Sequence, residues 1–176
     1  MVEILLFFAS AVFVDFVGYW LHRLAHVPGS PLHRAHLTHH AVNYPPQSVL
    51  SDRYRSSRKD SLIIWFAPVG IAYAGLVALA APHPIPVLVG GLVSAALSSA
   101  LHDLSHISGS IVWRWSLLKG IGVRHHAHHF KMKRNFGILL PVWDNLFGTR
   151  LRKSHRLERD PVLRHVRSRH LRRSQP

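Results

Sequence analysis

Residues 15–26 read DFVGYWLHRLAH, and they close a long apolar segment with two histidines set four positions apart. Residues three or four apart share one face of a helix, so His22, His26 and the carboxylate Asp15 are expected on the same side. Imidazole is the commonest metal ligand in proteins. The stretch therefore predicts a membrane helix that presents metal ligands at its end.

Four such histidine clusters occur along the chain, two with His-x3-His spacing and two with His-x2-His-His spacing. Each lies at or beyond the end of an apolar stretch, and on a helix each can aim its rings at a common point. Ten rings are too many for one ion and enough for two, which predicts a dinuclear metal site. The candidate ligands are His22, His26, His36, His39, His40, His102, His106, His125, His128 and His129.

The composition narrows the ligand chemistry. There are sixteen histidines, only eight carboxylates and no cysteine, which excludes iron–sulfur clusters, thiolate-ligated haem and disulfides. Imidazole ligands also suit zinc, copper or nickel, so the spacing does not name the metal. The histidines expected to lie outside the ligand set are His33, His83, His126, His155, His165 and His170.

The apolar residues fall in long blocks, which indicates burial in a bilayer. Residues 4–21 are almost entirely apolar, close to the ~20 residues that span the hydrocarbon. Residues 61–101 carry no Asp, Glu, Lys or Arg, and the proline-rich residues 81–86 break them into an expected helical hairpin. A cleaved signal peptide is disfavoured because the first segment has no basic region before it. The predicted fold class is an all-α integral membrane protein with about three transmembrane helices and a histidine-rich helical cap.

Helix breakers place the other elements. A short helix over 32–41 is expected to carry the second cluster and to end at residues 43–46, where two prolines follow. Pro68 is expected to kink the second long helix. Residues 110–122 mix tryptophans and leucines with basic residues and are expected to lie in the membrane interface. The predicted domains are a membrane-embedded unit over 1–150 and a basic tail over 151–176.

The formal net charge of +14 is unevenly distributed. Residues 150–176 hold ten of the 22 lysines and arginines, and residues 53–59 form a second basic group. The positive-inside rule places both groups, and with them the histidine clusters, on the cytoplasmic side. No nucleic-acid-reading module is recognisable beside these residues, so anionic lipid headgroups are the expected partner of this charge and nucleic acid is not.

Three carboxylates are candidates for supporting the ligands. A metal-bound imidazole usually donates its second N–H to a carboxylate or carbonyl, and Asp103, beside His102, and Asp144 are expected in that role. A helix-end charge is the alternative for Asp103. Asp15 lies inside a span, where a carboxylate is costly. It is expected either to pair with a polar group or orient a ligand, or to form a hydrogen bond between helices.

The clusters, residues 15–26, Asn135-Phe136-Gly137 and Trp143-Asp144-Asn145-Leu146-Phe147-Gly148-Thr149 together resemble the fatty acid hydroxylase and sterol desaturase superfamily over about residues 12–150. The resemblance implies a membrane di-iron enzyme that uses dioxygen and two electrons to hydroxylate or desaturate lipid C–H bonds. It also implies that the ten histidines bind two iron ions, that Asn135 supports them, and that a ferredoxin or a b-type cytochrome with its reductase donates electrons.

Two departures from the family pattern are visible. The chain begins with what resembles only the second helix of the usual first hairpin, and His33 stands where an aromatic residue is common. Neither departure removes a candidate ligand. The missing first helix predicts that the chain is a short variant, a fragment, or dependent on a partner helix.

The substrate is expected to enter sideways from the bilayer, between the first and third long helices, against Phe16, Trp20 and Leu101. The sequence leaves open which lipid is used, and whether it is hydroxylated or desaturated. The rival interpretation is a metal transporter or metal store. A transporter would place its ligands near the middle of the membrane, whereas these clusters lie at helix ends.

Overall fold

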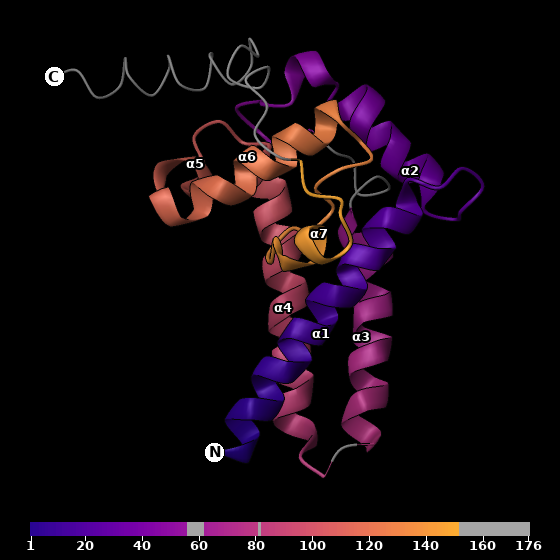
Figure 1. The fold of residues 1–176 in the computed structure, drawn as a ribbon, viewed down its shortest axis with the longest axis vertical. Coiled ribbons are helices and arrows are strands. Elements are labelled where there is room, and N and C mark those ends of the chain that lie inside the picture. Colours follow the sequence, from indigo (N-terminus) through magenta and orange to yellow (C-terminus); the bar gives the residue numbers. More distant parts are fainter. Residues whose placement is uncertain (56–61, 81, 152–176) are drawn as a thin grey trace, which may run out of the picture.

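The computed structural model describes residues 1–55, 62–80 and 82–151, and these are helical apart from loops and one isolated parallel bridge between Ser51 and Ile107. Three long helices form a stem, and the shorter helices gather at one end of it (Figure 1). The stem helices are α1 (Val2–Ala25), α3 (Leu62–Ala80) and α4 (Pro84–Ser105). The remaining elements are α2 (His33–Thr38), the π-helical turn η1 (His39–Asn43), the 3-10 turn η2 (Pro46–Ser48), α5 (Ile111–Arg114), α6 (Ser116–Phe130) and α7 (Val142–Leu146).

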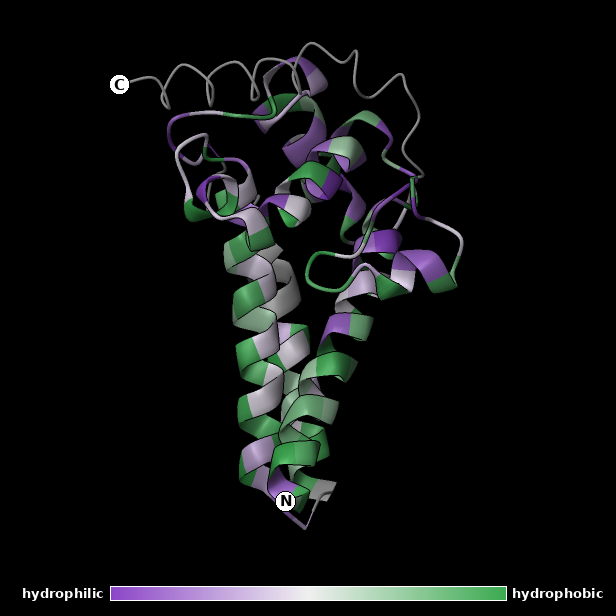
Figure 2. Cartoon of the chain, turned by 60° about the vertical axis from the view of Figure 1, so that its left-hand side comes forward, coloured by the Kyte–Doolittle hydropathy of each residue, from purple (hydrophilic) through white to green (hydrophobic). Residues whose placement is uncertain are grey.

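The stem is largely apolar, and most of the polar residues lie in the cap formed by the shorter helices and their loops, where they alternate with apolar ones (Figure 2). Among the described residues, α1 and α4 are long and apolar enough to cross a membrane, while α3 contributes a shorter apolar stretch, Pro68–Leu79. Only 22% of the apolar window in α1, and the same share in α4, is buried inside the protein. Apolar helices left this exposed are what a lipid environment requires. The structure therefore supports two membrane-spanning helices, and a third crossing by α3 stays a prediction.

Close packing of α1 against α4 sets the geometry of the stem. A Cβ atom added at Gly90 would lie 2.2 Å from the carbonyl oxygen of Phe7, so only glycine permits this approach. The Ser10 hydroxyl donates a hydrogen bond of 2.6 Å to the carbonyl of Val87. Small residues and a buried hydroxyl are typical of helix contacts in lipid, where close van der Waals packing replaces the hydrophobic effect.

The second histidine cluster does not lie on one regular helix as expected. The α-helical hydrogen bonding of α2 ends at Thr38, and the chain continues as the wider turn η1, which contains His39 and His40. Tyr44 closes this turn by donating its N–H to the carbonyl of His39 at 2.9 Å. Wide π turns often occur at functional sites because they change the direction of side chains.

The expected interfacial segment 110–122 is only partly at the surface. Trp113 is buried and donates its indole N–H to the carbonyl of Ser105 at 3.1 Å, so the prediction was wrong for this residue. Trp115 and Leu117 are exposed. Several predictions lie outside the described residues, namely those on the loop residues Arg58 and Lys59, on Ala81, and on the tail from 152 onward.

Replacing Gly90 with alanine should destabilise the stem by about 1–3 kcal/mol, because the added methyl group overlaps backbone that cannot move aside easily. Thermal unfolding of the detergent-solubilised protein measures the effect. Gly75→Ala is the matched control, since a Cβ there meets nothing within 4 Å. Equal unfolding temperatures for the two variants would contradict the close α1–α4 approach.

Candidate metal centre

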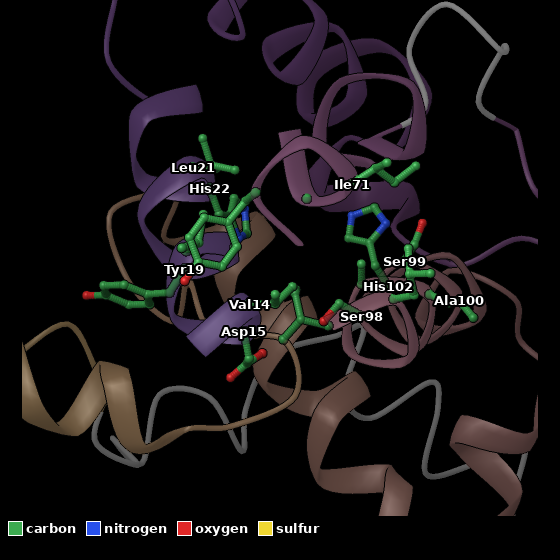
Figure 3. Close-up of a pocket in the computed structure, with 18 of the residues that line it drawn as sticks. Val14, Asp15, Tyr19, Leu21, His22, Ile71, Ser98, Ser99, Ala100 and His102 are labelled. Carbon is green, nitrogen blue, oxygen red and sulfur yellow. The ribbon is translucent and has the colours of Figure 1, made fainter. Parts of the chain in front are cut away.

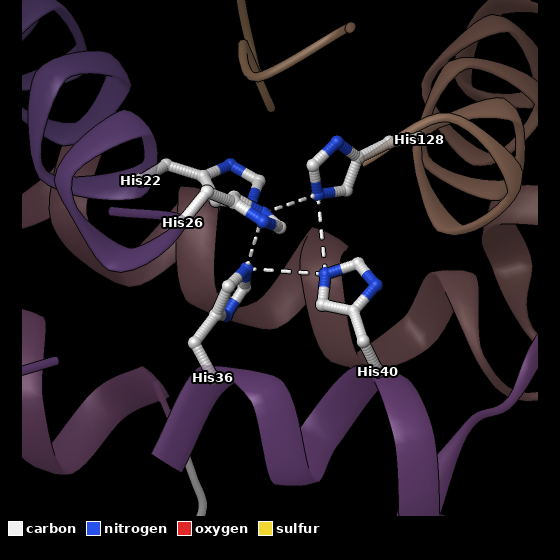
Figure 4. Close-up of side chains that lie close together, drawn as sticks. All are labelled: His22, His26, His36, His40 and His128. Carbon is white, nitrogen blue, oxygen red and sulfur yellow. Dashed lines mark hydrogen bonds between the residues drawn. The ribbon is translucent and has the colours of Figure 1, made fainter. Parts of the chain in front are cut away.

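Five imidazoles meet at the cap end of the stem and form a first candidate metal site, here called site 1. They are His22 and His26 at the end of α1, His36 of α2, His40 of η1 and His128 of α6 (Figure 4). One nitrogen of each lies within 4.8 Å of the others. Neighbouring Nε2 atoms face one another, at 2.8 Å for His36 and His26 and 3.2 Å for His128 and His40. Two nitrogens held ~2.1 Å from one ion at a right angle are about 3.0 Å apart, so this spacing suits a shared cation.

A second group, site 2, contains His39, His106, His125 and His129, all of them buried. Their ligand nitrogens also lie within 4.8 Å of one another, and the Nε2 atoms of His125 and His106 are 2.9 Å apart. The two sites adjoin, because the rings of His40 and His129 stack with centroids 4.1 Å apart. The two adjoining groups could each hold a metal ion.

Each His-x2-His-His cluster serves both sites. In the cluster on α2 and η1, the two outer histidines join site 1 and His39 joins site 2. In α6 the assignment is reversed, with His128 alone in site 1. Adjacent helical residues point about 100° apart, so neighbouring histidines in these clusters can reach different ions.

Backbone carbonyls hold four of these rings in one tautomer. Because a carbonyl only accepts hydrogen bonds, the Nδ1 atom of each ring must be the donor, which leaves Nε2 with a free lone pair. The pairs are His22 with Phe136 at 2.7 Å, His128 with Arg134 at 2.7 Å, His129 with Tyr44 at 2.9 Å and His106 with Val49 at 2.9 Å. The free lone pairs belong to the Nε2 atoms that cluster in the two sites.

Burial favours the neutral, metal-binding form of most of the imidazoles in the two sites. Burial lowers the pKa of seven of them well below the usual value, and the neighbouring imidazoles lower it further. These are His36, His39, His40, His106, His125, His128 and His129. Burial, with a smaller contribution from His33, lowers the pKa of His26 to about 4. A cation would therefore not have to displace protons near neutral pH.

His102 is the predicted ligand that belongs to neither group. It lies beside site 2, with its ring centroid 4.5 Å from that of His125. Its Nδ1 is 2.9 Å from Oδ1 of Asp103, the partner that the sequence predicted. Its Nε2 is buried without a hydrogen-bond partner among the described residues. Metal binding by His102 stays a prediction.

The two histidines next to the clusters that the sequence set aside have other partners. His33 donates from Nδ1 to the carbonyl of Ala25 at 3.1 Å. His126 donates from Nε2 to the carbonyl of Ser105 at 3.0 Å, and its ring packs on Trp113 with centroids 4.6 Å apart. Both lie outside the two groups of candidate ligands.

Asp144 supports site 1 through the backbone and makes no hydrogen bond to an imidazole among the described residues, which corrects the expected direct contact. Its carboxylate accepts hydrogen bonds from the N–H groups of Phe136 at 2.8 Å and Gly137 at 3.0 Å, and from the Thr149 hydroxyl at 2.7 Å. Phe136 in turn supplies the carbonyl that holds His22. The fully buried carboxylate thus positions a ligand at one remove.

The Asn-Phe-Gly segment has a conformational reason for its sequence. Asn135 has a positive φ of 56°, which asparagine tolerates better than most residues, and its Oδ1 accepts the N–H of Leu151 at 2.9 Å. A Cβ at Gly137 would lie 2.6 Å from the carbonyl oxygen of Leu140. Asn135 thus shapes the loop that holds Phe136, and contacts no imidazole in the described hydrogen bonds.

Asp15 makes the helix-to-helix hydrogen bond that was one of its two expected roles. Its Oδ2 accepts the indole N–H of Trp143 in α7 at 2.8 Å. One turn further along α1, the hydroxyl groups of Tyr19 and Thr149 lie 2.8 Å apart. These two contacts fasten α7 and its loop to α1, close to the ligand His22.

Tyr44 is a supporting residue that sequence reasoning missed. It was interpreted only as part of a helix break, yet it is fully buried and its carbonyl accepts from His129. Its ring stacks on His106 with centroids 3.8 Å apart. The signal in the sequence was a large aromatic residue held between a histidine cluster and two prolines.

A cavity of about 430 Å³ opens beside site 1, among α1, α3 and α4. Figure 3 shows His22 of α1 and His102 of α4 on either side of it. Phe16, Trp20 and Leu101, the predicted substrate contacts, do not line this cavity. Phe16 packs on Trp143 and Phe147, and Trp20 on Phe147, because both face α7. Helical spacing instead turns Val14, Gly18 and Leu21 toward the cavity.

A family model described as fatty acid hydroxylase matches residues 7–149. The chain belongs to the fatty acid hydroxylase family. Comparisons with curated proteins and with solved structures found no match. Membership of this family, part of the fatty acid hydroxylase/sterol desaturase superfamily, implies an oxidoreductase that hydroxylates or desaturates lipids. It also agrees with the apolar helices of the stem and with histidine groups that could hold metal.

Replacing Asp144 with asparagine should weaken metal binding by roughly 10–100-fold, because an amide cannot accept all three hydrogen bonds of the carboxylate. Equilibrium dialysis followed by elemental analysis measures the loss. Glu3→Gln, an exposed carboxylate at the opposite end of the stem, is the control. Unchanged metal affinity in the Asp144 variant would show that the loop does not position His22.

The metal-free protein should lose stability as the pH falls from about 6.5 toward 4. Burial lowers the pKa of His126 in the folded protein to about 4, whereas the unfolded chain takes up that proton near pH 6.5. The unfolded state therefore binds more protons across this window, and by pH 5 His126 alone would cost on the order of 2 kcal/mol. Thermal unfolding after chelation, at pH 7.5 and pH 5, tests this. A higher unfolding temperature at pH 5 would contradict it.

Proposed function

We propose that the protein is a membrane di-iron oxygenase that hydroxylates or desaturates an unactivated C–H bond of a lipid, such as a fatty acyl chain or a sterol. One observation carries the proposal. Two adjoining groups of mostly buried imidazoles lie beside an apolar cavity between the long helices, and His22 of site 1 lines that cavity. In this protein of the fatty acid hydroxylase family, the candidate metal sites therefore lie next to a cavity whose apolar wall suits a lipid.

The donor set fits two iron ions. The five histidines of site 1 and the four of site 2 offer neutral nitrogen donors, and His102 stands beside site 2 as the tenth. Bound iron, with dioxygen as co-substrate and two electrons from a donor protein, would supply the oxidation of the C–H bond. Neither group contains a carboxylate, so imidazole would be the only protein ligand of the metals.

The chain's own residues would position the substrate and exclude water from it. The cavity wall is almost entirely apolar, so it takes up an alkyl group and excludes water from the reacting carbon. His22 belongs to site 1 and also lines the cavity, which brings the substrate to the metal. Asp144 accepts the N–H of Phe136, and the carbonyl of Phe136 keeps the ring of His22 oriented toward site 1 and the cavity.

The proposed placement in the membrane follows from charge. The cap carries exposed basic residues such as Arg53, Lys131 and Lys133, and we assign it with the tail to the cytoplasmic side. There it would meet a ferredoxin or a b-type cytochrome as electron donor. The stem would cross the bilayer with three helices, and lipid substrate would reach the cavity from the membrane.

The position of the ligands argues against a metal transporter. Both groups lie in the cap and at the cap ends of α1 and α4, while the described parts of the stem between them and the far end hold no further group of ligands. A transporter would need such ligands along a path through the membrane.

Replacing His39 with alanine should abolish the oxidised lipid, because this residue belongs to site 2 and both its ring nitrogens are buried without a hydrogen-bond partner among the described residues. Lipid mass spectrometry of cells expressing each variant is the measurement, with the gain of one oxygen marking hydroxylation and the loss of two hydrogens marking desaturation. His33→Ala, a histidine outside both sites, should retain product. Full product from the His39 variant would refute the proposed function.

A further inference from the structure

His26 differs from the other histidines of the two sites in its exposure. Eight of the nine grouped histidines are buried, and His26 is the half-buried one. Its Nε2 points into site 1, where it lies 2.8 Å from Nε2 of His36 and 3.0 Å from Nε2 of His128 (Figure 4). Its Nδ1 is not among the buried nitrogens and makes no hydrogen bond within the described residues. One edge of this ring therefore faces water while the other faces the site.

The ring of His26 can turn outward more easily than the other rings of site 1. His22 and His128 would each have to break a 2.7 Å hydrogen bond between Nδ1 and a backbone carbonyl. His36 and His40 are only 2% exposed, so close-packed neighbours leave their rings no space to rotate. His26 has neither restraint, and it is the capping residue at the C-terminal end of α1. Side chains that reach the surface change rotamer readily.

The number of ligands also favours opening at site 1. Site 1 has five imidazoles, so four remain around an ion when His26 turns away. Four nitrogen donors complete the tetrahedral coordination that an ion such as zinc adopts in proteins. Site 2 has four grouped histidines, and the loss of one would leave three. Site 1 can therefore release one ligand and still hold its ion.

Site 2 has no exposed ligand of its own, since each of its four histidines is at most 2% exposed. Tyr44, itself fully buried, stacks on His106. Site 1 adjoins site 2 where the rings of His40 and His129 stack. The apolar cavity that reaches His102 is a poor route for a hydrated cation, because polar groups lose their hydration there. Among the described residues, the polar way to site 2 therefore passes through site 1.

We infer that His26 is the gate through which divalent cations enter and leave the metal centre. Its ring turns toward the solvent, the opening admits a hydrated cation to site 1, and the returning ring becomes the fifth ligand. An ion bound for site 2 passes through site 1, so site 1 holds the exchangeable ion and site 2 the retained one. This inference deepens the proposed function and rests on it only for iron as the resident metal.

Chemical modification of the metal-free protein tests which ligand faces water. The full-length protein in detergent is treated with diethyl pyrocarbonate, which acylates accessible neutral imidazoles, and peptide mass spectrometry follows each histidine. His26 should react at least about tenfold faster than the other eight grouped histidines, because those rings become accessible only through rarer local opening. Saturation with Zn²⁺ should slow this reaction, because Nε2 then binds metal and Nδ1 carries the proton. Faster modification of another grouped histidine would overturn the inference.

Release of bound ions tests the passage. The parent and two variants are loaded with two equivalents of Co²⁺, and visible absorption follows the loss of the metal to excess EDTA. The parent should release its ions in two phases, with the ion of site 2 in the slow one. His26→Ala should speed the slow phase at least about tenfold, because the passage stays open although every ligand of site 2 is kept.

His36→Ala is the matched control. It also removes one ligand of site 1, but a buried one that leaves His26 in place. Its slow phase should stay within about twofold of the parental rate, because the gate still opens and closes.

The inference is overturned if both variants speed the slow phase equally, if His26→Ala leaves it unchanged, or if the parent releases both ions in one phase. Should a variant fail to fold, the modification of the parent protein decides. None of these results touches the proposed function, which is judged by oxidised lipid in the His39→Ala experiment. Absence of oxidised lipid from cells expressing the parent chain, with gating intact, would count against the oxygenase and not against the gate.

Discussion

The constraint on which the rest of the structure depends is the enforced approach of imidazole nitrogens in a buried place. In site 1 the carbonyls of Phe136 and Arg134 take the Nδ1–H groups of His22 and His128, so the Nε2 atoms of these two rings are acceptors that face the other imidazoles. Burying unpaired acceptors costs free energy, and a shared cation removes that cost. The carbonyls of Phe136 and Arg134 therefore matter as much as the rings, because they decide which nitrogen faces inward.

That requirement explains why loops, and not only helices, are built so specifically in the cap. Asp144 accepts three hydrogen bonds in order to hold two residues of backbone, and one of these residues orients His22. Asn135 and Gly148 adopt positive φ angles that let the chain turn around this carboxylate. The motifs around Asn135 and Asp144, which mark the family, thus position the ligand His22 through backbone hydrogen bonds without binding metal themselves.

The outer and inner surfaces of the stem have different roles. Its outer surface is apolar and exposed, as a bilayer requires, while small residues on its inner faces leave a cavity that ends at site 1. The close contact at Gly90 joins α1 and α4 toward the far end, whereas at Gly18, nearer the metal centre, an added Cβ atom would meet no heavy atom within 4 Å. One pair of helices therefore provides both the packing and the room for a lipid chain.

The sequence by itself determined the helical class, the apolar helices and nine histidines that gather in the two sites, because spacing along a helix and length in a bilayer are local properties. It also predicted the contact of Asp103 with His102, which are neighbours in the chain. Only the tertiary structure decided which histidine joins which site, since His39 and His40 are adjacent in sequence yet diverge at the π turn.

The tertiary structure likewise decided that Phe16 and Trp20 pack on α7 while Gly18 faces the cavity. All three positions lie on the same apolar helix, and an apolar residue can contact lipid, substrate or another helix with equal chemical suitability. Which of these it meets depends on the direction in which the neighbouring helices approach, and that direction is set by contacts between segments far apart in the chain.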